Sequence, residues 1–191
     1  AKLLPLGESF YLKQAQWILI GLVVLVIGIK ISYQKFIDLS YVIYGINIIL
    51  LALVLVVGHI ALGAQRWFSI GGFAFQPSEF IKLSLILVLA NYVGSKKGAM
   101  EDFKNMIVPI FLLAIPFALV VLQPDLGTAL LLLPIFFSIL IAGGANPKYL
   151  IGMILIGLAG LPVFWHALRE YQRQRLLVFV NPNIDPLGAG Y

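Results

Sequence analysis

The sequence contains no cysteine and few charged residues. Only 11% of its 191 residues are charged, whereas 61% are hydrophobic. Without cysteine, disulfide bonds, thiol catalysis and cysteine-ligated metal sites are excluded. The two histidines, His59 and His166, lie near the ends of apolar runs with no partner at metal-ligand spacing, so we interpret them as interface or packing residues. Nucleotide loops, paired glycosidase carboxylates and nucleophile elbows are also missing.

The formal net charge is +5, but no basic groove interleaved with aromatic residues is visible, so nucleic-acid binding is set aside. In a chain this apolar, positive charge bears on membrane topology and on anionic lipid headgroups. The sequence begins at Ala1 and lacks the ordered charged, apolar and cleavage regions of a signal peptide.

Long apolar runs predict an all-α, polytopic transmembrane helical bundle. A hydrocarbon core of about 30 Å needs about 20 apolar residues per helix, and helices satisfy their own backbone in lipid. Prolines 109, 116, 134 and 162 lie inside the runs, and we expect bends whose freed carbonyls neighbouring helices can satisfy. The more polar segment 169–191 is predicted to begin an extended loop outside the membrane. We predict six spans, at roughly residues 14–30, 41–62, 79–94, 106–122, 126–145 and 148–168.

Six spans would place both termini and the connections near 63–78 and 123–125 on one side of the membrane. The opposite connections contain several lysines, whereas the internal loops of the first side offer only Arg66, with Lys82 just inside a span. Because cytoplasmic loops are enriched in Lys and Arg, we predict that the first side is extracytoplasmic. Basic residues in the terminal flanks reduce this bias. The lysines of the opposite side are Lys30, Lys35, Lys96, Lys97 and Lys104.

The motif Gln123-Pro124-Asp125-Leu126-Gly127 sets a carboxylate between two apolar runs. An acidic residue at the edge of a span is by default a functional candidate. Asp125 is also in place to cap the following helix. The two interpretations are compatible, since a carboxylate at a helix N-terminus favours its ionised form and suits a cation, an arginine or a lysine. We predict that Asp125→Asn loses function while the fold is retained.

The motif Gln76-Pro77-Ser78-Glu79, followed by Lys82, is a second candidate. Pro77 suits a first helical turn, and Ser78 is a candidate cap. Glu79 and Lys82 are three residues apart on one helix face and are expected to form a partly desolvated pair. Such a pair could also serve only to orient the helix at the interface. If the two charges act as a pair, removing one partner should impair function more than exchanging the two residues.

Two arginine-containing segments complete the candidates. Arg66, beside Trp67, can bind a phosphate at headgroup level, because a guanidinium matches phosphate oxygens; it can equally serve as an interface anchor. Arg173 and Arg175 lie two residues apart and point to different faces of a helix or strand, so they need not act on one ligand.

Together these motifs resemble the SEDS family of bacterial cell-wall polymerases. They match in order and spacing over most of the chain, and the last two are more similar to the RodA branch, for elongation, than to the related FtsW branch, for division. The matching residues are Gly63–Trp67, Gln76–Glu79 with Lys82, Gln123–Gly127, Tyr171–Arg175 and Asp185–Tyr191.

The resemblance implies a peptidoglycan glycosyltransferase in the bacterial cytoplasmic membrane. Its substrate is lipid II, an undecaprenyl-pyrophosphate-linked disaccharide peptide, and its usual partner is a class B penicillin-binding protein. A basic Arg66 and Lys82 fit a pyrophosphate leaving group, and a carboxylate fits a sugar hydroxyl or a divalent cation, the one cofactor left open. The expected substrate-binding or functional residues are Arg66, Gln76, Ser78, Glu79, Lys82, Gln123, Asp125, Arg173 and Arg175.

The resemblance also implies that this chain is incomplete. The family has about ten spans and a large extracytoplasmic loop, whose start is expected at 169–191. We expect the first span and everything after the start of this loop to be missing here. The family's catalytic Asp is expected in that missing part, so no catalytic residue is assigned. Asn181 stands where relatives often have Asp, which weakens a carboxylate role there. We expect that this chain by itself does not polymerise lipid II. The alternatives are a lipid II flippase and a non-catalytic scaffold for a penicillin-binding protein.

Overall fold

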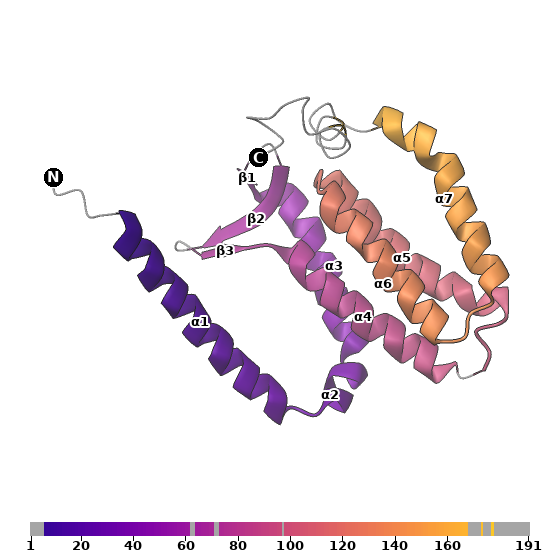
Figure 1. The fold of residues 1–191 in the computed structure, drawn as a ribbon, viewed down its shortest axis with the longest axis horizontal. Coiled ribbons are helices and arrows are strands. Elements are labelled where there is room, and N and C mark those ends of the chain that lie inside the picture. Colours follow the sequence, from indigo (N-terminus) through magenta and orange to yellow (C-terminus); the bar gives the residue numbers. More distant parts are fainter. Residues whose placement is uncertain are drawn as a thin grey trace. The chain divides into compact units, whose positions relative to one another are not determined.

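The computed structural model describes residues 6–61, 64–70, 73–96, 98–167, 173 and 177. This part of the chain is mostly helical, with three short strands between two of the helices (Figure 1). The helices are α1 (Leu6–Lys30), α2 (Tyr33–Asp38), α3 (Ser40–Val57), α4 (Pro77–Ser95), α5 (Phe103–Leu122), α6 (Leu126–Ala142) and α7 (Pro147–Ala167). The strands are β1 (His59–Ala61), β2 (Ala64–Ile70) and β3 (Phe73–Phe75).

The chain divides into two compact units, Ala1–Asp38 and Leu39–Tyr191. The first unit contains α1 and α2. The side chains described in α1 are all exposed, so this helix gains little from burial within its own unit. Its apolar stretch, Gln14–Lys30, therefore suits contact with lipid or with other helices.

Each of the six segments predicted to span a membrane forms a helix. Three of them, α3, α4 and α5, are long and apolar enough to cross a bilayer by length and composition, and the apolar stretches of α1, α6 and α7 are shorter. The prediction of an all-α, polytopic membrane fold is confirmed, and the chain is part of an integral membrane protein. That all six helices cross the membrane stays a prediction.

Two helices are shorter than the spans predicted for them. Helix α3 ends at Val57, because Gly58 takes an extended conformation (φ −66°, ψ 151°), whereas the predicted span is 41–62. Helix α6 ends at Ala142, before Gly143 and Gly144, whereas the predicted span is 126–145. Gly144 has a φ of +77°, a left-handed conformation that glycine adopts without a steric penalty. The chain changes direction at these two glycine-containing ends, one after α3 and one after α6.

The segment predicted as a loop around 63–78 contains strands β2 and β3. Together with β1, which lies in the predicted span 41–62, they form a small antiparallel sheet with strand order β1-β2-β3. His59 pairs with Trp67 across β1 and β2, and Phe68 pairs with Phe75 across β2 and β3. Sequence reasoning missed this sheet. Two of its strands have three residues each, which is too short for an alternating pattern to be read.

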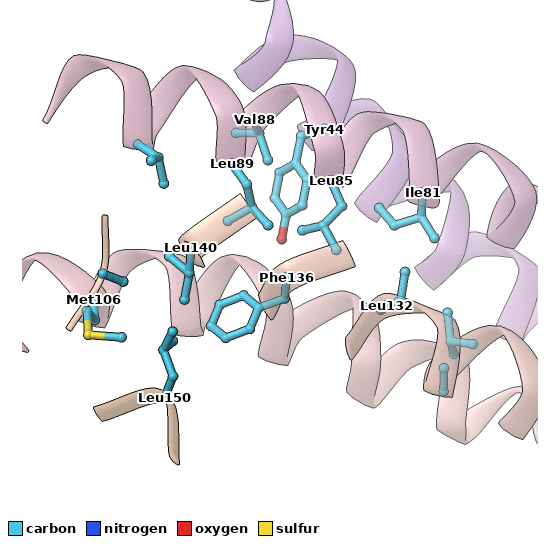
Figure 2. Packing of buried hydrophobic residues seen from close by; sticks show 14 of the residues in the cluster. Tyr44, Ile81, Leu85, Val88, Leu89, Met106, Leu132, Phe136, Leu140 and Leu150 are labelled. Carbon is cyan, nitrogen blue, oxygen red and sulfur yellow. The ribbon is translucent and has the colours of Figure 1, made fainter. Parts of the chain in front are cut away.

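The core of the second unit lies between α3, α4, α5 and α6. Figure 2 shows Leu85 and Leu89 of α4 directed towards Phe136 and Leu140 of α6, with Tyr44 of α3 beside them. Leu85, Leu89 and Leu140 are fully buried. Residues four apart on a helix share one face, so this stripe makes α4 the most buried of the three long apolar helices.

Polar contacts fix the directions of these helices. At one end of the bundle, Asn91 Nδ2 near the end of α4 donates to Ser40 Oγ at the start of α3, at 2.9 Å. At the other end, Gln76 before α4 meets Asp125 before α6. We call this second end the motif end; it comprises the starts of α4 and α6 and the turn between α5 and α6. Helices α4 and α6 therefore both start at the motif end.

One proline inside a helix has its missing hydrogen bond replaced by a neighbour. Pro116 has no N–H, so it leaves the carbonyl of Leu112, four residues earlier, without its helical donor. The hydroxyl of Tyr44 in α3 donates to this Leu112 oxygen at 2.8 Å. The expectation that a neighbouring helix satisfies a carbonyl freed by proline is confirmed at this position.

Candidate functional site

Asp125 caps helix α6, as the sequence predicts. The backbone N–H of Thr128 donates to Asp125 Oδ1 at 3.4 Å, and the N–H of Ala129 donates to the Asp125 carbonyl at 3.1 Å. A carboxylate in this position satisfies a free backbone donor and complements the helix dipole. Only 6% of Asp125 is exposed, so these contacts are made away from bulk solvent.

The other carboxylate oxygen of Asp125 joins α6 to α4. Asp125 Oδ2 accepts hydrogen bonds from Gln76 Nε2 at 3.0 Å, from Thr128 Oγ1 at 3.0 Å and from Ser78 Oγ at 3.4 Å. Gln76 Nε2 also donates to Ser78 Oγ at 2.8 Å. We call Gln76, Ser78, Asp125 and Thr128 the Asp125 network. It brings two of the sequence motifs into direct contact across 49 positions of the chain.

Local sequence explains how α4 presents these side chains. Pro77 occupies the first turn of α4, as predicted, where its missing N–H costs nothing. The prediction that Ser78 caps this helix was wrong. Gln76 is the N-cap residue, and Ser78, already inside the helix, directs its hydroxyl to Asp125. Ser78 is fully buried, so its contact with the carboxylate compensates its desolvation.

The predicted ion pair of α4 is present. Lys82 Nζ donates to Glu79 Oε2 at 2.9 Å, and the side chains are 25% and 55% exposed, respectively. Lys82 is thus partly desolvated, as expected, whereas Glu79 is more open than predicted. Exposed pairs contribute about 0–1 kcal/mol to stability. The pair is therefore available for ligand contact without being needed to hold the fold together.

Lys82 also lies at a groove between α4 and α6. The groove has a volume of about 450 Å³. Its lining is apolar apart from Lys82 and Ser138. The lining residues are Lys82, Ile86, Leu131, Pro134, Ile135, Ser138 and Ile139.

Gln123 holds the turn before Asp125 against α3. Its Nε2 donates to the carbonyl oxygen of Leu51 at 3.0 Å, and the residue is fully buried. Its Oε1 is buried with no hydrogen-bond partner among the described residues. The structure thus gives this predicted site residue a positioning contact between α3 and the α5–α6 turn.

Of the three predicted arginines, Arg173 is the one whose side chain the structure describes. Arg66 belongs to strand β2, and its side chain lies outside the described residues, as does Arg175. Arg173 donates from Nε to the Trp165 carbonyl at 3.0 Å and from Nη2 to the His166 carbonyl at 2.9 Å. Arg173 therefore binds carbonyls near the end of α7, a favourable place for a cation.

The remaining sequence predictions have mixed outcomes. His166 Nδ1 lies 2.7 Å from the carbonyl oxygen of Pro162, four residues earlier in α7, which suits a local structural role. The side chain of His59 and the whole of Asn181 lie outside the described residues. Among the described residues, no group of three or more His, Cys, Asp or Glu side chains could hold a metal ion. A bound divalent cation stays a prediction.

Sequence reasoning missed Thr128. Its hydroxyl donates to Asp125 Oδ2, and its backbone N–H donates to Oδ1. The signal was available, because a residue three positions after an N-cap Asp is where the capped N–H is expected. Thr128 belongs to an otherwise apolar run, which hides this signal.

Known proteins are similar to this chain over most of its length. The family model FTSW_RODA_SPOVE, described as "Cell cycle protein", matches residues 4–191. The chain is 35% identical over 175 residues to "Peptidoglycan glycosyltransferase MrdB" of Escherichia coli K12, an alignment that covers 91% of this chain and 47% of that protein. It is 32% identical over 188 residues to "Probable peptidoglycan glycosyltransferase FtsW" of Geobacter metallireducens, covering 97% and 50%. The chain spans about half the length of the curated relatives that it matches.

A solved structure shares this fold. It is described as "Structural coordination of polymerization and crosslinking by a peptidoglycan synthase complex". The TM-score is 0.79 with 34% sequence identity, and the match covers 95% of this chain and 54% of the other. The likeness thus extends over nearly all of the present chain and about half of its counterpart.

Proposed function

The chain belongs to the FtsW/RodA/SpoVE family of cell cycle proteins, and from this premise we propose that the whole protein is a peptidoglycan glycosyltransferase. It polymerises lipid II into glycan strands during cell elongation. The relatives MrdB and FtsW carry the name of this activity. The observation that carries the proposal is the Asp125 network, because it assembles two family motifs at one end of the bundle, beside the exposed pair of Glu79 and Lys82.

The site residues divide into two groups by burial. Lys82 and Glu79 are exposed enough to touch a ligand, and an ammonium group suits the pyrophosphate of lipid II, whose negative charge is carried away with the leaving group. Asp125 and Ser78 are buried and hydrogen-bonded, and they position the start of α4. Gln76, Gln123 and Thr128 support the same arrangement. Substrate contact by Arg66, Arg173 and Arg175 remains part of the proposal.

The proposed setting is the bacterial cytoplasmic membrane, with the motif end extracytoplasmic. The distribution of lysines supports this side, since the connections predicted to be cytoplasmic carry more of them. A class B penicillin-binding protein is the proposed partner. The likeness to a synthase complex that couples polymerization with crosslinking supports this partner.

The test is a polymerisation assay on the full-length gene product in liposomes that present lipid II on the outer face. We expect glycan polymer, and a marked loss of polymer with Lys82→Gln. Lys104→Gln is the matched control, because Lys104 is exposed and lies near the start of α5, at the other end of the bundle. Lipid II translocation without polymer would support a flippase instead. Stimulation of a penicillin-binding protein without polymer would support a scaffold.

A further inference from the structure

Two of the grooves among the described helices of the second unit differ in charge. The groove of about 470 Å³ between α5, α6 and α7 is lined by apolar residues alone. The groove of about 450 Å³ between α4 and α6 has Lys82 in its lining. Both volumes fall within the about 300–1,000 Å³ of small-molecule sites. The charge of Lys82 gives the second groove a chemical preference that the first lacks.

This groove runs from a charged end at Lys82 to an uncharged end. Helices α4 and α6 both start at the motif end, so higher residue numbers on either helix lie farther from it. Lys82 is close to the start of α4, and Ile86 is one turn deeper. On α6 the lining runs from Leu131 to Ile139. A ligand that follows this gradient has an anionic head at Lys82 and an apolar chain beyond it.

Two short side chains of α6 belong to the groove lining. Pro134 and Ser138 are one turn apart on the same face of α6, and neither is a long side chain. The larger Leu131, Ile135 and Ile139 belong to the same lining. The groove is thus bounded by branched aliphatic side chains, which suits a single flexible hydrocarbon chain.

The head of the groove has N–H donors left for an anion in addition to Glu79. Lys82 Nζ has three N–H donors, and Glu79 Oε2 accepts from it at 2.9 Å. The start of α4, one turn away, adds the positive end of a helix dipole. A pyrophosphate offers several oxygens to these donors, and charge-assisted bonds of this kind are about twice as strong as neutral ones.

We propose that the groove between α4 and α6 holds the prenyl units next to the pyrophosphate of a polyprenyl-pyrophosphate-linked substrate, with Lys82 on the phosphates. The assignment rests on the proposed function and adds a place for the lipid part of the substrate. Ser138 then lies beneath the chain rather than in the reacting centre. A bulky side chain at this position should exclude the prenyl units and leave the Asp125 network intact.

The test uses the full-length gene product in nanodiscs and a polyprenyl diphosphate with a diazirine in its first prenyl unit. We expect photo-crosslinks to peptides of α4 and α6 at the groove. Ser138→Trp, and the smaller Ser138→Leu, should each lower the crosslink yield about tenfold, and Lys82→Gln should weaken binding about tenfold, as expected for the loss of a charge-assisted hydrogen bond. Ala118→Trp, on α5 and outside the groove lining, should change neither.

Crosslinks that lie elsewhere, or that persist in both Ser138 variants, would overturn the assignment. So would equal labelling by a diazirine phosphatidylglycerol, which would make the groove an ordinary lipid contact. Thermal unfolding confirms that the variants are folded. Because binding is measured without turnover, the two proposals fail separately: polymer with crosslinks elsewhere contradicts the groove assignment alone, and crosslinks in the groove without polymer contradict the glycosyltransferase alone.

Discussion

The two carboxylate oxygens of Asp125 accept hydrogen bonds from different partners. Oδ1 accepts from the start of α6, and Oδ2 accepts from side chains of both α4 and α6. Asn at this position keeps one acceptor but turns the other into a donor, which then faces the donors of Gln76 or Thr128. An unsatisfied buried group costs about 1–3 kcal/mol.

We therefore expect Asp125→Asn to fold with an unfolding free energy lower by about 1–3 kcal/mol and to lose polymerisation activity, because the start of α4 is no longer fixed. Unfolding in detergent micelles and the polymerisation assay measure the two effects. Asp102→Asn, at the exposed N-cap of α5 whose side chain makes no cap bond, is the matched control. A fully active and normally stable Asp125→Asn protein would contradict the prediction.

Glu79 and Lys82 allow pairing to be separated from ligand contact. Because both side chains are partly exposed, we expect Glu79→Gln, Lys82→Gln and the exchanged pair (Glu79→Lys with Lys82→Glu) to change stability by less than about 1 kcal/mol. Polymerisation activity should fall in all three variants. Lys82→Gln removes the ammonium group, Glu79→Gln removes the acceptor that holds it, and the exchanged pair places the ammonium group away from the phosphates. Recovery of activity in the exchanged variant would mean that only the pairing matters.

Tyr44 of α3 and Pro116 of α5 allow the contact between these two helices to be tested. The hydroxyl of Tyr44 serves the Leu112 carbonyl that Pro116 leaves without a helical donor. Tyr44→Phe should therefore lower the unfolding free energy by about 0.5–2 kcal/mol. In a Pro116→Ala background the same change should cost nearly nothing, because the substituted alanine supplies the missing backbone N–H.

The measurement is a double-mutant cycle on unfolding in micelles. Phe136 and Leu85 near Tyr44 remain in place in all four proteins (Figure 2), so loss of packing is held constant. An equal cost of Tyr44→Phe in both backgrounds would show that the hydroxyl acts independently of the proline.

The elements of this fold differ in how well the sequence predicts them. Hydropathy predicts the long helices, and local rules predict the cap at Asp125 and the pair of Glu79 and Lys82, because each of these depends on residues within one helical turn. The contact of Gln76 with Asp125 joins residues 49 positions apart and has no local signature. The bond of Arg173 to the end of α7 was missed for a related reason, since its acceptors are backbone carbonyls that carry no sequence signal.

Successive connections of the whole molecule are predicted to lie on alternate sides of the membrane, and a cysteine-labelling experiment can test this topology. The chain has no cysteine, so a single cysteine introduced into it has no competing thiol in this part of the protein. Phe75, just before α4, is 37% exposed at the motif end, and Glu101 is exposed in the turn before α5. If the motif end is extracytoplasmic, Phe75→Cys reacts with a membrane-impermeant maleimide on intact spheroplasts, and Glu101→Cys reacts only after permeabilisation.

The same reagent tests whether α7 crosses the bilayer, since its apolar stretch is shorter than those of α3, α4 and α5. Lys148, near its start, and Trp165, near its end, are both exposed. A crossing helix makes Lys148→Cys protected and Trp165→Cys reactive in intact spheroplasts. Equal protection of the two would leave α7 on one side of the membrane, and reversed labelling of Phe75 and Glu101 would turn the motif end towards the cytoplasm. Reversed labelling would also place the Glu79–Lys82 pair on the side opposite to the one where lipid II is polymerised. The topology therefore decides whether this pair can act on lipid II as proposed.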